Sequence, residues 1–523
     1  MSLFKKFITV GATTFGSRLF GFARETLMAA ALGTGPMADV FYAAFRFPNL
    51  FRRLFAEGAF NAAFVPLFSK EIEAGGLDGA KRFSEEVFGV LFTVLLGLTI
   101  VMELAMPLLV RFIIAPGFAD DAEKFSLTVR LAAVMFPYLM SMSLTAMLSG
   151  MLNSLHHFFA AAVAPIFLNL VMIGVLFYTL HIGADPALTA WYLSWAVLVA
   201  GVLQLFVVYV GVRHAGIRLG FKWPRMTQNV KRLLILAVPA AVTGGVTQIN
   251  LVIGQAIASG KDGAIAALQY ADRIYQLPLG VVGVAVGVVL LPELSRALKS
   301  GQEKDALTIQ NRSIEFVLFL TLPAAVGLWV LSEDIIRVLY ERGAFTAENT
   351  KLVGAILAWY GVGLPFFVLI KALQPGFYAR EDTKSPMRFT GVSVVINSAL
   401  SILLFPILFE RGIAIAEAVA GIVNVIQLFV TLYRRGHIQP DWRLVSRSLR
   451  LLAAALAMGG VLLMLSRHFA ADLVPAASFL HAAGALAVEI GAAMLIYFGL
   501  AFLLGGADIG MVRRALQRKA KGR

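Results

Sequence analysis

Residues 14–68 read TFGSRLFGFARETLMAAALGTGPMADVFYAAFRFPNLFRRLFAEGAFNAAFVPLF. This stretch contains two apolar segments, each long enough to cross a bilayer. Together they carry five arginines: Arg18, Arg24, Arg46, Arg52 and Arg53. A charge at the centre of a bilayer costs a few kcal/mol, so such residues usually face a protein interior or a wet cavity and mark a pathway. The arginines outnumber the acids Glu25 and Glu57 of the same segments, which predicts that this region binds an anion.

The composition is that of a membrane protein. Of the 523 residues, 59% are hydrophobic and 15% are charged, whereas about a quarter of the residues of a soluble domain are charged. Apolar runs of about 20 residues recur along the whole chain, which predicts an all-α polytopic membrane protein. Lys5 and Lys6 precede the first run without a small-residue cleavage site, so this run is predicted to be a span rather than a signal peptide. The absence of cysteine excludes disulfides and thiolate metal sites.

The apolar runs predict about fourteen transmembrane helices. They cover residues 7–32, 39–68, 85–112, 126–152, 160–181, 190–212, 229–257, 264–294, 313–331, 352–378, 388–409, 413–433, 448–466 and 479–504. With a cytoplasmic N-terminus, 29 of the 45 Lys and Arg fall on the cytoplasmic side, which is the bias expected of short loops. An even number of spans also keeps the basic C-terminal tail cytoplasmic. The formal charge of +14 is then assigned to anionic lipid headgroups rather than to nucleic acid.

The chain repeats itself at an offset of 226 to 228 residues. Residues 65–70 (VPLFSK) resemble residues 291–296 (LPELSR), and Asn169 matches Asn397. Because the offset contains six helices, both copies have the same orientation, which predicts two six-helix lobes in pseudo-twofold repeat around a central cavity. The predicted domains are residues 1–215 (helices 1–6), 216–436 (helices 7–12) and 437–523 (two extra C-terminal helices and a basic tail).

The arginines of the first two helices are the main candidates for a binding site. Arginine suits phosphate because its planar fork binds oxygens in pairs and it stays charged. The alternative is that Arg53 with Glu57, and Arg18 or Arg24 with Glu25, are internal ion pairs that hold the two helices together. There are fewer acids than arginines, so a cargo with at least one phosphate is favoured for the remaining charges.

A further arginine lies in the second half of the chain. Gln269, Arg273 and Gln276 form a polar stripe on the predicted helix 264–294. Asp272 is not expected to be the private partner of Arg273, because adjacent helical residues point about 100° apart. A cargo site between lobes would need such an arginine from the second lobe, and the alternative is a capping or inter-helix ion pair.

Glu417 is a candidate for ion coupling. It lies in the predicted helix 413–433 with Asn424 and Gln427, and Asn397 lies in the preceding helix. A buried carboxylate near amide oxygens can bind Na⁺ or carry a proton, and a neutral, hydrogen-bonded structural carboxyl explains the pattern equally well. No role is assigned to three further charged residues within spans: Glu103, Lys371 and Glu489.

Other classes of function find little support in the residues. The seven histidines lie in loops or at the ends of predicted spans, and no P-loop is present. A membrane enzyme for polyprenyl phosphates should show paired carboxylates or histidines at one membrane face, and a scaffold needs no arginines within its spans. An antiporter for cationic drugs needs spare carboxylates. A carrier of a phosphate-bearing cargo is therefore favoured.

Five segments resemble the MurJ (MviN) family of lipid II flippases, in the multidrug/oligosaccharidyl-lipid/polysaccharide (MOP) exporter superfamily. They are residues 17–25 (SRLFGFARE), 48–60 (PNLFRRLFAEGAF), 115–118 (APGF), 270–273 (YADR) and 375–380 (PGFYAR). The resemblance implies a flippase that moves undecaprenyl-diphosphate-linked disaccharide-pentapeptide, lipid II, from the inner to the outer leaflet of the bacterial cytoplasmic membrane by alternating access. Such a flippase serves peptidoglycan synthesis. A flippase for another polyprenyl-linked glycan and a MATE-like drug antiporter are the alternatives within the superfamily.

The resemblance also implies roles for individual residues. The substrate-binding positions that it implies are Ser17, Arg18, Arg24, Asp39, Arg52, Glu57 and Arg273, and Arg53 is a further candidate. The last two predicted helices, 448–466 and 479–504, are implied to form a groove for the polyprenyl tail. This agrees with the nearly pure apolar run 451–465. Residue 25 departs from the family pattern, since it is Glu here and often Asp in the family.

The energy source stays open at this point. Some members of the family have a sodium site near helices 7, 11 and 12, and Asn397 and Glu417 are the candidates to match it. No cofactor and no firm metal site are predicted, so coupling to Na⁺, to H⁺ or to the membrane potential alone remain alternatives. The potential favours export of anions by about 2.3 kcal/mol per charge per 100 mV. The expected partners are lipid II and membrane lipids, without nucleic acid, and the functional unit is expected to be a monomer.

Overall fold

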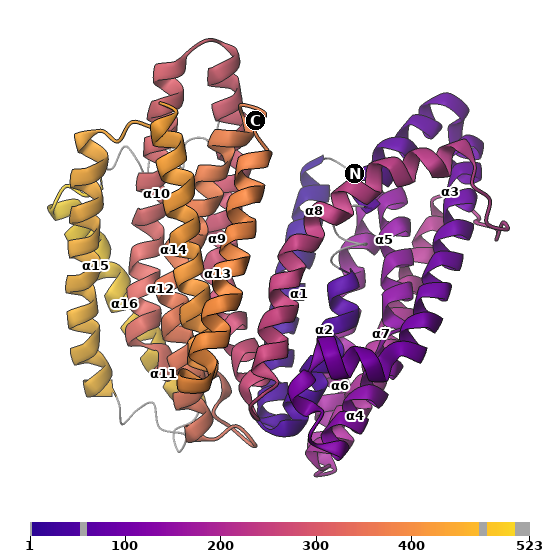
Figure 1. Ribbon diagram of the computed structural model, residues 1–523, viewed down its shortest axis with the longest axis horizontal. Helices are drawn as coiled ribbons and strands as arrows, with labels where there is room; N and C mark the ends of the chain where they lie inside the picture. The colour runs from indigo at the N-terminus through magenta and orange to yellow at the C-terminus, as the bar shows by residue number, and fades with distance from the viewer. Residues whose placement is uncertain (1–2, 53–59, 470–478, 508–523) are drawn as a thin grey trace. The chain divides into compact units, whose positions relative to one another are not determined.

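The computed structural model describes residues 3–52, 60–469 and 479–507, and nearly all of them are helical (Figure 1). They form two compact units: Met1–Ala266 with Gly343–Phe345, and Ala267–Arg342 with Thr346–Arg523. The helices of the first unit are α1 (Leu3–Leu32), α2 (Pro36–Arg52), α3 (Phe60–Leu109), α4 (Ala122–Met135), α5 (Tyr138–Ser154), α6 (Phe158–His181), α7 (Pro186–His214) and α8 (Gln228–Ala258), with short helical turns at Val110–Ile114 and Pro116–Phe118. The all-α prediction is confirmed.

The second unit begins within α9, whose first three residues belong to the first unit. Its helices are α9 (Ala264–Lys299), α10 (Glu303–Val330), α11 (Ser332–Tyr340), α12 (Ala347–Tyr378), α13 (Lys384–Leu408), α14 (Glu410–Arg434), α15 (Trp442–Phe469) and α16 (Phe479–Leu503). Each of the fourteen predicted ranges overlaps at least one of the helices of the two units.

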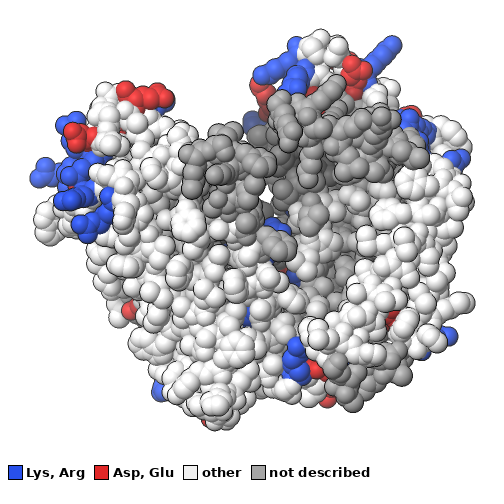
Figure 2. All heavy atoms as spheres, turned by 180° about the vertical axis from the view of Figure 1, so that it is seen from behind, with Lys and Arg blue, Asp and Glu red and all other residues white. Residues whose placement is uncertain are grey.

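Ten helical stretches within the described residues are long and apolar enough to cross a membrane. The helices α1 and α2, which carry the arginines, are not among them. On the face seen in Figure 2, Lys, Arg, Asp and Glu gather mainly toward the ends of the helices, and broad uncharged flanks lie between them. This distribution fits helices whose middle sections contact lipid chains.

The predicted gap between the second and third spans is helical. The sequence predicted that one helix ends at residue 68 and the next begins at 85, but α3 runs from Phe60 to Leu109. Its only non-helical residues are Gly75 (φ −134°, ψ 15°) and Gly76 (φ 59°, ψ −154°). A positive φ is accessible to glycine at little cost, so the chain bends at this pair. The polar residues on either side have good helix propensity and continue the helix beyond the apolar run.

Two further boundaries differ from the prediction for local reasons. The predicted helix 126–152 is broken at Phe136–Pro137 into α4 and α5, because a proline inside a helix removes a hydrogen bond and clashes with the preceding turn. The helix α11 was not predicted. It has nine residues with Glu333, Asp334 and Arg337 on its polar side, so it lacks the apolar length by which spans are recognised.

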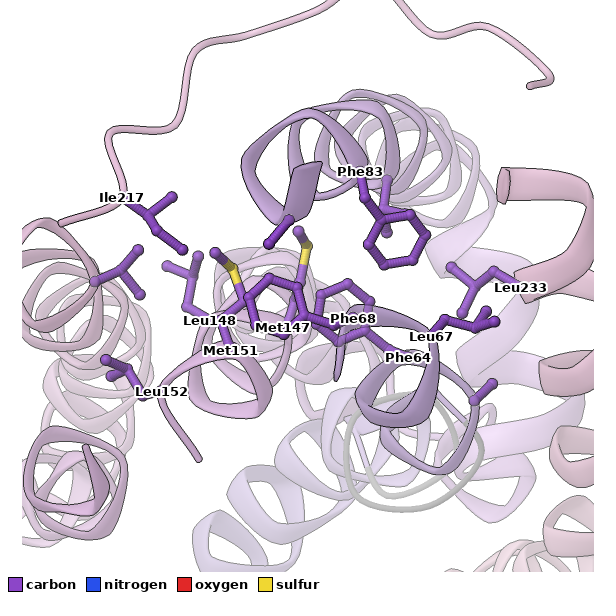
Figure 3. Packing of buried hydrophobic residues seen from close by; sticks show 14 of the residues in the cluster. Phe64, Leu67, Phe68, Phe83, Met147, Leu148, Met151, Leu152, Ile217 and Leu233 are labelled. Carbon is purple, nitrogen blue, oxygen red and sulfur yellow. The ribbon is translucent and has the colours of Figure 1, made fainter. Parts of the chain in front are cut away.

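The segment between α7 and α8 and the first turns of α8 pack back onto α3. Ile217 and Leu233 are buried in one apolar cluster with Phe64, Phe68 and Phe83 (Figure 3). Polar contacts hold the same segment, since Glu85 accepts a hydrogen bond from the Gly220 amide at 3.0 Å and pairs with Lys222 at 2.9 Å. This packing joins residues 217–233 to the first compact unit, which extends to Ala266. The predicted domain limits at 215/216 and 436/437 follow the sequence repeat rather than the packing, and they stay a prediction.

The helices α13 and α14 form a tight antiparallel pair. They meet at Phe409, which has a φ of 51°, and Gly412 lies against Leu404 so closely that a Cβ there would be 2.8 Å from the Leu404 backbone. The last two helices, α15 and α16, lie side by side and pack with α10 and α11 around a separate apolar cluster.

Candidate anion-binding site

A buried polar network joins α1, α2 and α6. Arg24 and Glu25 are only 8% and 1% exposed, and Arg24 Nη2 lies 2.5 Å from Glu25 Oε1. The Tyr42 hydroxyl donates to Glu25 Oε2 at 2.8 Å, and Arg24 Nη1 donates to Asn169 Oδ1 at 3.1 Å. Asn169 Nδ2 in turn donates to the backbone carbonyl of Ser17 at 3.1 Å. The network therefore fixes the middle of α1 to α2 and α6.

The Arg24–Glu25 pair decides between the two partners that the sequence left open for Glu25, namely Arg18 and Arg24. Neighbouring helical residues point about 100° apart, which suggests that they do not pair. The arginine side chain is long enough to reach around the helix. Burial favours the ion pair, because an isolated charge in an apolar interior is strongly destabilising. The alternative in which Arg24 and Glu25 form an internal ion pair is the one that the structure shows.

Arg18 lies in a different situation. It is on the exposed side of α1, and no hydrogen bond or ion pair joins it to any residue that the structure describes. Arg18 and Glu25 are seven residues apart and therefore share a helical face, but no hydrogen bond or ion pair joins them. Arg18 follows Ser17, whose carbonyl is held by Asn169, so its backbone is anchored while its guanidinium is available to a ligand.

The structure describes only part of the arginine cluster of α2. Arg52 Nε donates to Asn49 Oδ1 at 2.8 Å, and Arg46 is half-buried and engaged in an interaction of its own. Arg53 and Glu57 lie outside the described residues. Their predicted i,i+4 pair and their predicted place in the binding site stay predictions.

Asp39 has a clear role in positioning α9. It is fully buried in the first turn of α2, and its two carboxylate oxygens accept from the backbone amides of Gly263 at 2.6 Å and Ala266 at 2.8 Å. Gly263 directly precedes α9 and Ala266 lies in its first turn, where amide donors have no partner within the helix. Asp39 therefore caps α9 across a long distance in sequence, and Lys124 Nζ supports it from 3.9 Å.

Arg273 is a half-buried residue of α9 in the second unit. Among the described residues it makes no hydrogen bond or ion pair. The neighbouring Asp272 accepts instead from Gln276 one turn later, as expected from the argument that Asp272 is not a private partner of Arg273. The residues around it are anchored by aromatic contacts, with the rings of Tyr270 and Tyr340 5.3 Å apart.

The candidates for ion coupling lie on α13 and α14, which pack against each other over their length. Asn397 is buried and Glu417 is half-buried. Four buried oxygens of this helix pair have no hydrogen-bond partner among the described residues: Ser398 Oγ, Ser401 Oγ, Asn424 Oδ1 and Gln427 Oε1. Hydroxyl and amide oxygens of this kind suit hard cations. No three His, Cys, Asp or Glu side chains come together within the described residues as a metal site.

The sequence did not identify several residues that hold the site. Asn169 was noted only for its repeat match with Asn397, although an amide within an apolar span was a signal that it bonds to another helix. Tyr42 gave no signal beyond a hydroxyl on an apolar helix. Lys124 lies outside the predicted helix 126–152, but it is buried in α4 against Asp39, Asp262 and the ring of Phe118.

The fold is that of a multi-pass helical membrane protein, with ten helical stretches among the described residues that are long and apolar enough to cross a membrane. A family model described as "Lipid II flippase MurJ" matches residues 28–484. A "Probable lipid II flippase MurJ" of Rhizobium tropici is 77% identical over 99% of this chain and 97% of that protein, and one of Rhizobium meliloti (strain 1021) is 62% identical over 99% and 97%.

A solved structure gives the same result. "Lipid II flippase MurJ, inward closed conformation" superposes with a TM-score of 0.77 at 26% identity, covering 97% of this chain and 99% of that one. The chain belongs to the MurJ family of lipid II flippases. This is a family of transporters and not of enzymes.

Proposed function

We propose that this protein is a lipid II flippase of the bacterial inner membrane. Its cargo is undecaprenyl-diphosphate-linked disaccharide-pentapeptide, which it moves from the inner to the outer leaflet for peptidoglycan synthesis. Membership of the MurJ family supports the cargo, and relatives with that name match nearly the full length of the chain. A MATE-like drug antiporter is not favoured by these matches.

The observation that carries the proposal is the contrast between Arg18 and Arg24. Arg24 is neutralised by Glu25, whereas Arg18 is exposed and has no acidic partner among the described residues. An unneutralised guanidinium on a membrane helix favours an anionic ligand, and its fork fits the oxygens of a diphosphate. The anchoring of Ser17 by Asn169 positions Arg18 before the ligand arrives, which lowers the entropy lost on binding.

The remaining features of the carrier belong to the same proposal. It has fourteen spans with both termini cytoplasmic, two six-helix lobes that alternate in access, and a monomeric functional unit. The bias of Lys and Arg and the sequence repeat support this arrangement. The helices α15 and α16 accommodate the polyprenyl tail, and the apolar surface of α15 supports this role. The energy comes from the membrane potential, or from Na⁺ or H⁺ bound near Asn397 and Glu417.

The remaining substrate-site candidates are proposed with different roles. Arg52, Arg53 and Arg273 are proposed as further diphosphate contacts, and Ser17, Asp39 and Glu57 as residues that position them. Arg24 is proposed to act mainly by holding α1, because its charge is already used within the protein. This division makes Arg18 the better residue for a binding test, since a change at Arg24 also disturbs the packing of α1.

Binding of purified protein in lipid nanodiscs tests the proposal. The ligands are lipid II, undecaprenyl monophosphate and a cationic drug, each measured with the native chain, Arg18→Ala and the control Arg130→Ala, an exposed arginine of α4. A hydrogen bond to a charged group contributes about 1.5–3 kcal/mol, so Arg18→Ala should weaken lipid II binding by about ten-fold or more. The control should bind like the native chain.

The other ligands decide between the alternatives. Tight binding of the drug without binding of the diphosphate lipid would replace the flippase by an antiporter. A lipid II affinity equal to that of an undecaprenyl diphosphate with an unrelated glycan would leave a flippase for lipid-linked glycans in general. Equal affinities for lipid II and for undecaprenyl monophosphate would show that Arg18 does not recognise the diphosphate.

A further inference from the structure

Glu489 of α16 is a buried carboxyl that the proposed transport function does not use. It is 0% exposed, and neither of its carboxylate oxygens has a hydrogen-bond partner among the described residues. Measured along the helix at 1.5 Å per residue, it lies about 15 Å from the start of α16. A carboxyl at this depth without donors needs a physical explanation, because buried polar groups are nearly always paired.

The face of α16 that carries Glu489 is otherwise apolar. The neighbouring buried residues on this face follow a spacing of three to four: Ala482, Ala485, Leu486, Ala493 and Tyr497. They pack against α10, α11 and α15. Two turns beyond Glu489 the same face contains Tyr497, whose hydroxyl donates to the Phe319 carbonyl at 2.8 Å. The packing thus supplies a partner for the tyrosine and leaves the carboxyl without one.

The charged groups of the surrounding helices do not neutralise Glu489. Asp334 of α11 interacts with it electrostatically, and this is a like charge. Arg337, the cation of α11, is already engaged by Asp334 at 2.7 Å and by Glu341 at 3.6 Å. Asp334 also accepts a hydrogen bond from the Ser466 hydroxyl of α15 at 2.6 Å.

The other helices around Glu489 do not neutralise it either. The half of α10 from residue 316 to 330 contains no charged residue. The charged and titratable groups of α15 on the side of Ser466 are Arg467 and His468, in its last turn, and Glu333 is the remaining acid of α11. The nearest titratable residues of α16 itself are His481 and Tyr497, each eight residues from Glu489.

We propose that Glu489 is a proton-binding site that holds α16 in its packed position. An ionised carboxylate without a partner in apolar surroundings costs many kcal/mol, and such a group takes up a proton instead. The proton is supplied by the aqueous phase, and it binds one carboxylate oxygen of Glu489 without any other bond changing. When the proton leaves, the charge destabilises the apolar contacts of α16 with α10, α11 and α15, and the helix loosens from the second unit.

Infrared spectroscopy of the intact protein in nanodiscs tests the site directly. The native chain at neutral pH should show a carboxylic-acid C=O band that shifts in deuterated water, and Glu489→Gln should remove it. The control is Glu348→Gln, which replaces an exposed glutamate in the first turn of α12 and should leave the band unchanged. A native spectrum identical to that of Glu489→Gln in this region would overturn the proposal.

Thermal stability gives a second, independent reading. Glutamine has nearly the shape of a protonated glutamate, so Glu489→Gln should keep the Tm of the native chain or raise it. On going from neutral to alkaline pH, the Tm of the native chain should fall by more than that of Glu489→Gln. A Tm several degrees lower for Glu489→Gln at neutral pH would show that the charge is needed and would contradict the proposal. An increase of the native Tm with sodium alone would assign the site to Na⁺ instead. None of these readings depends on lipid II binding, so they fail or succeed separately from the proposed function.

Discussion

Glu25 of α1 and Glu489 of α16 are buried to the same degree but in opposite surroundings. They are 1% and 0% exposed. Glu25 has a guanidinium at 2.5 Å and a tyrosine hydroxyl at 2.8 Å, whereas no described residue donates to Glu489. The first carboxyl is held by two donors of a polar network, and the second lies among apolar side chains. Burial alone therefore does not tell what a carboxyl in a membrane helix does, and its donors do.

The comparison also separates two kinds of arginine. Arg24 pairs with Glu25 and donates a hydrogen bond to Asn169. Its guanidinium group is therefore engaged within the protein. Arg18, six residues earlier on the same helix, has no such match among the described residues. A binding site for an anion needs an arginine without an acidic partner, such as Arg18. Paired residues such as Arg24 and Glu25 hold its helix in place.

The largest expected effect comes from breaking the Arg24–Glu25 pair. Glu25→Gln keeps the shape of the side chain but leaves Arg24 as an unneutralised buried charge, which should lower the free energy of unfolding by about 3–5 kcal/mol. Unfolding in detergent, followed by fluorescence, measures the change. Arg24→Met combined with Glu25→Met removes both charges and should be less harmful than Glu25→Gln alone.

A matched control shows whether the effect belongs to burial. Glu73 is an exposed glutamate of α3, and Glu73→Gln should change the free energy of unfolding by less than about 0.5 kcal/mol. If Glu25→Gln were as mild as Glu73→Gln, the pair would not hold α1, and the distinction between Arg18 and Arg24 would be lost.

A smaller effect is expected at Asp39, a buried carboxyl whose donors are backbone amides. Asp39→Ala removes the cap of α9 and should cost about 1–2 kcal/mol. Asp39→Asn keeps an oxygen acceptor, and since Asn is as good a cap as Asp, it should recover at least half of this loss. Hydrogen exchange at Gly263 and Ala266, whose amides donate to Asp39, should accelerate in Asp39→Ala. Unchanged exchange there would mean that these amides do not depend on Asp39.

The helices of this fold were predictable from the sequence because apolar length is a local property. The breaks were less so. Gly75–Gly76 bends a helix where a loop was predicted, and α11 has too few apolar residues to be recognised. The packing of Ile217 and Leu233 onto α3 depends on residues about 150 positions away, so the sequence repeat could not show where the first compact unit ends.

The candidate site was predictable in composition and not in pairing. An excess of arginines is visible in residues 14–68. Which of them is neutralised depends on Tyr42 and Asn169. Asn169 is far from α1 in the sequence, and it reaches α1 because α6 packs against α1 in the fold. The cap that Asp39 forms on α9 is a similar case, because the amides of Gly263 and Ala266 are more than 200 residues away. Long-range partners of polar groups are what a single sequence does not contain.

The smallest expected effect is at Asp382, which lies in the loop between α12 and α13. Its carboxylate accepts several hydrogen bonds. Hydrogen bonds from the Ser385 hydroxyl and from Arg435, with one from the Ser385 amide, hold the pKa of Asp382 well below its usual range. The donors stabilise the ionised form, so their contribution is present above the unfolded pKa of about 3.9. It is lost as the pH falls through the folded pKa. Because Arg435 is largely exposed, Asp382→Asn should cost at most about 1 kcal/mol at neutral pH. Melting curves of the native chain and the variant should therefore differ slightly at neutral pH and converge in acid. A gap that widened in acid would mean that the carboxyl is stabilised in its protonated form, as we propose for Glu489, and that counting donors does not predict how a carboxyl of this protein responds to pH.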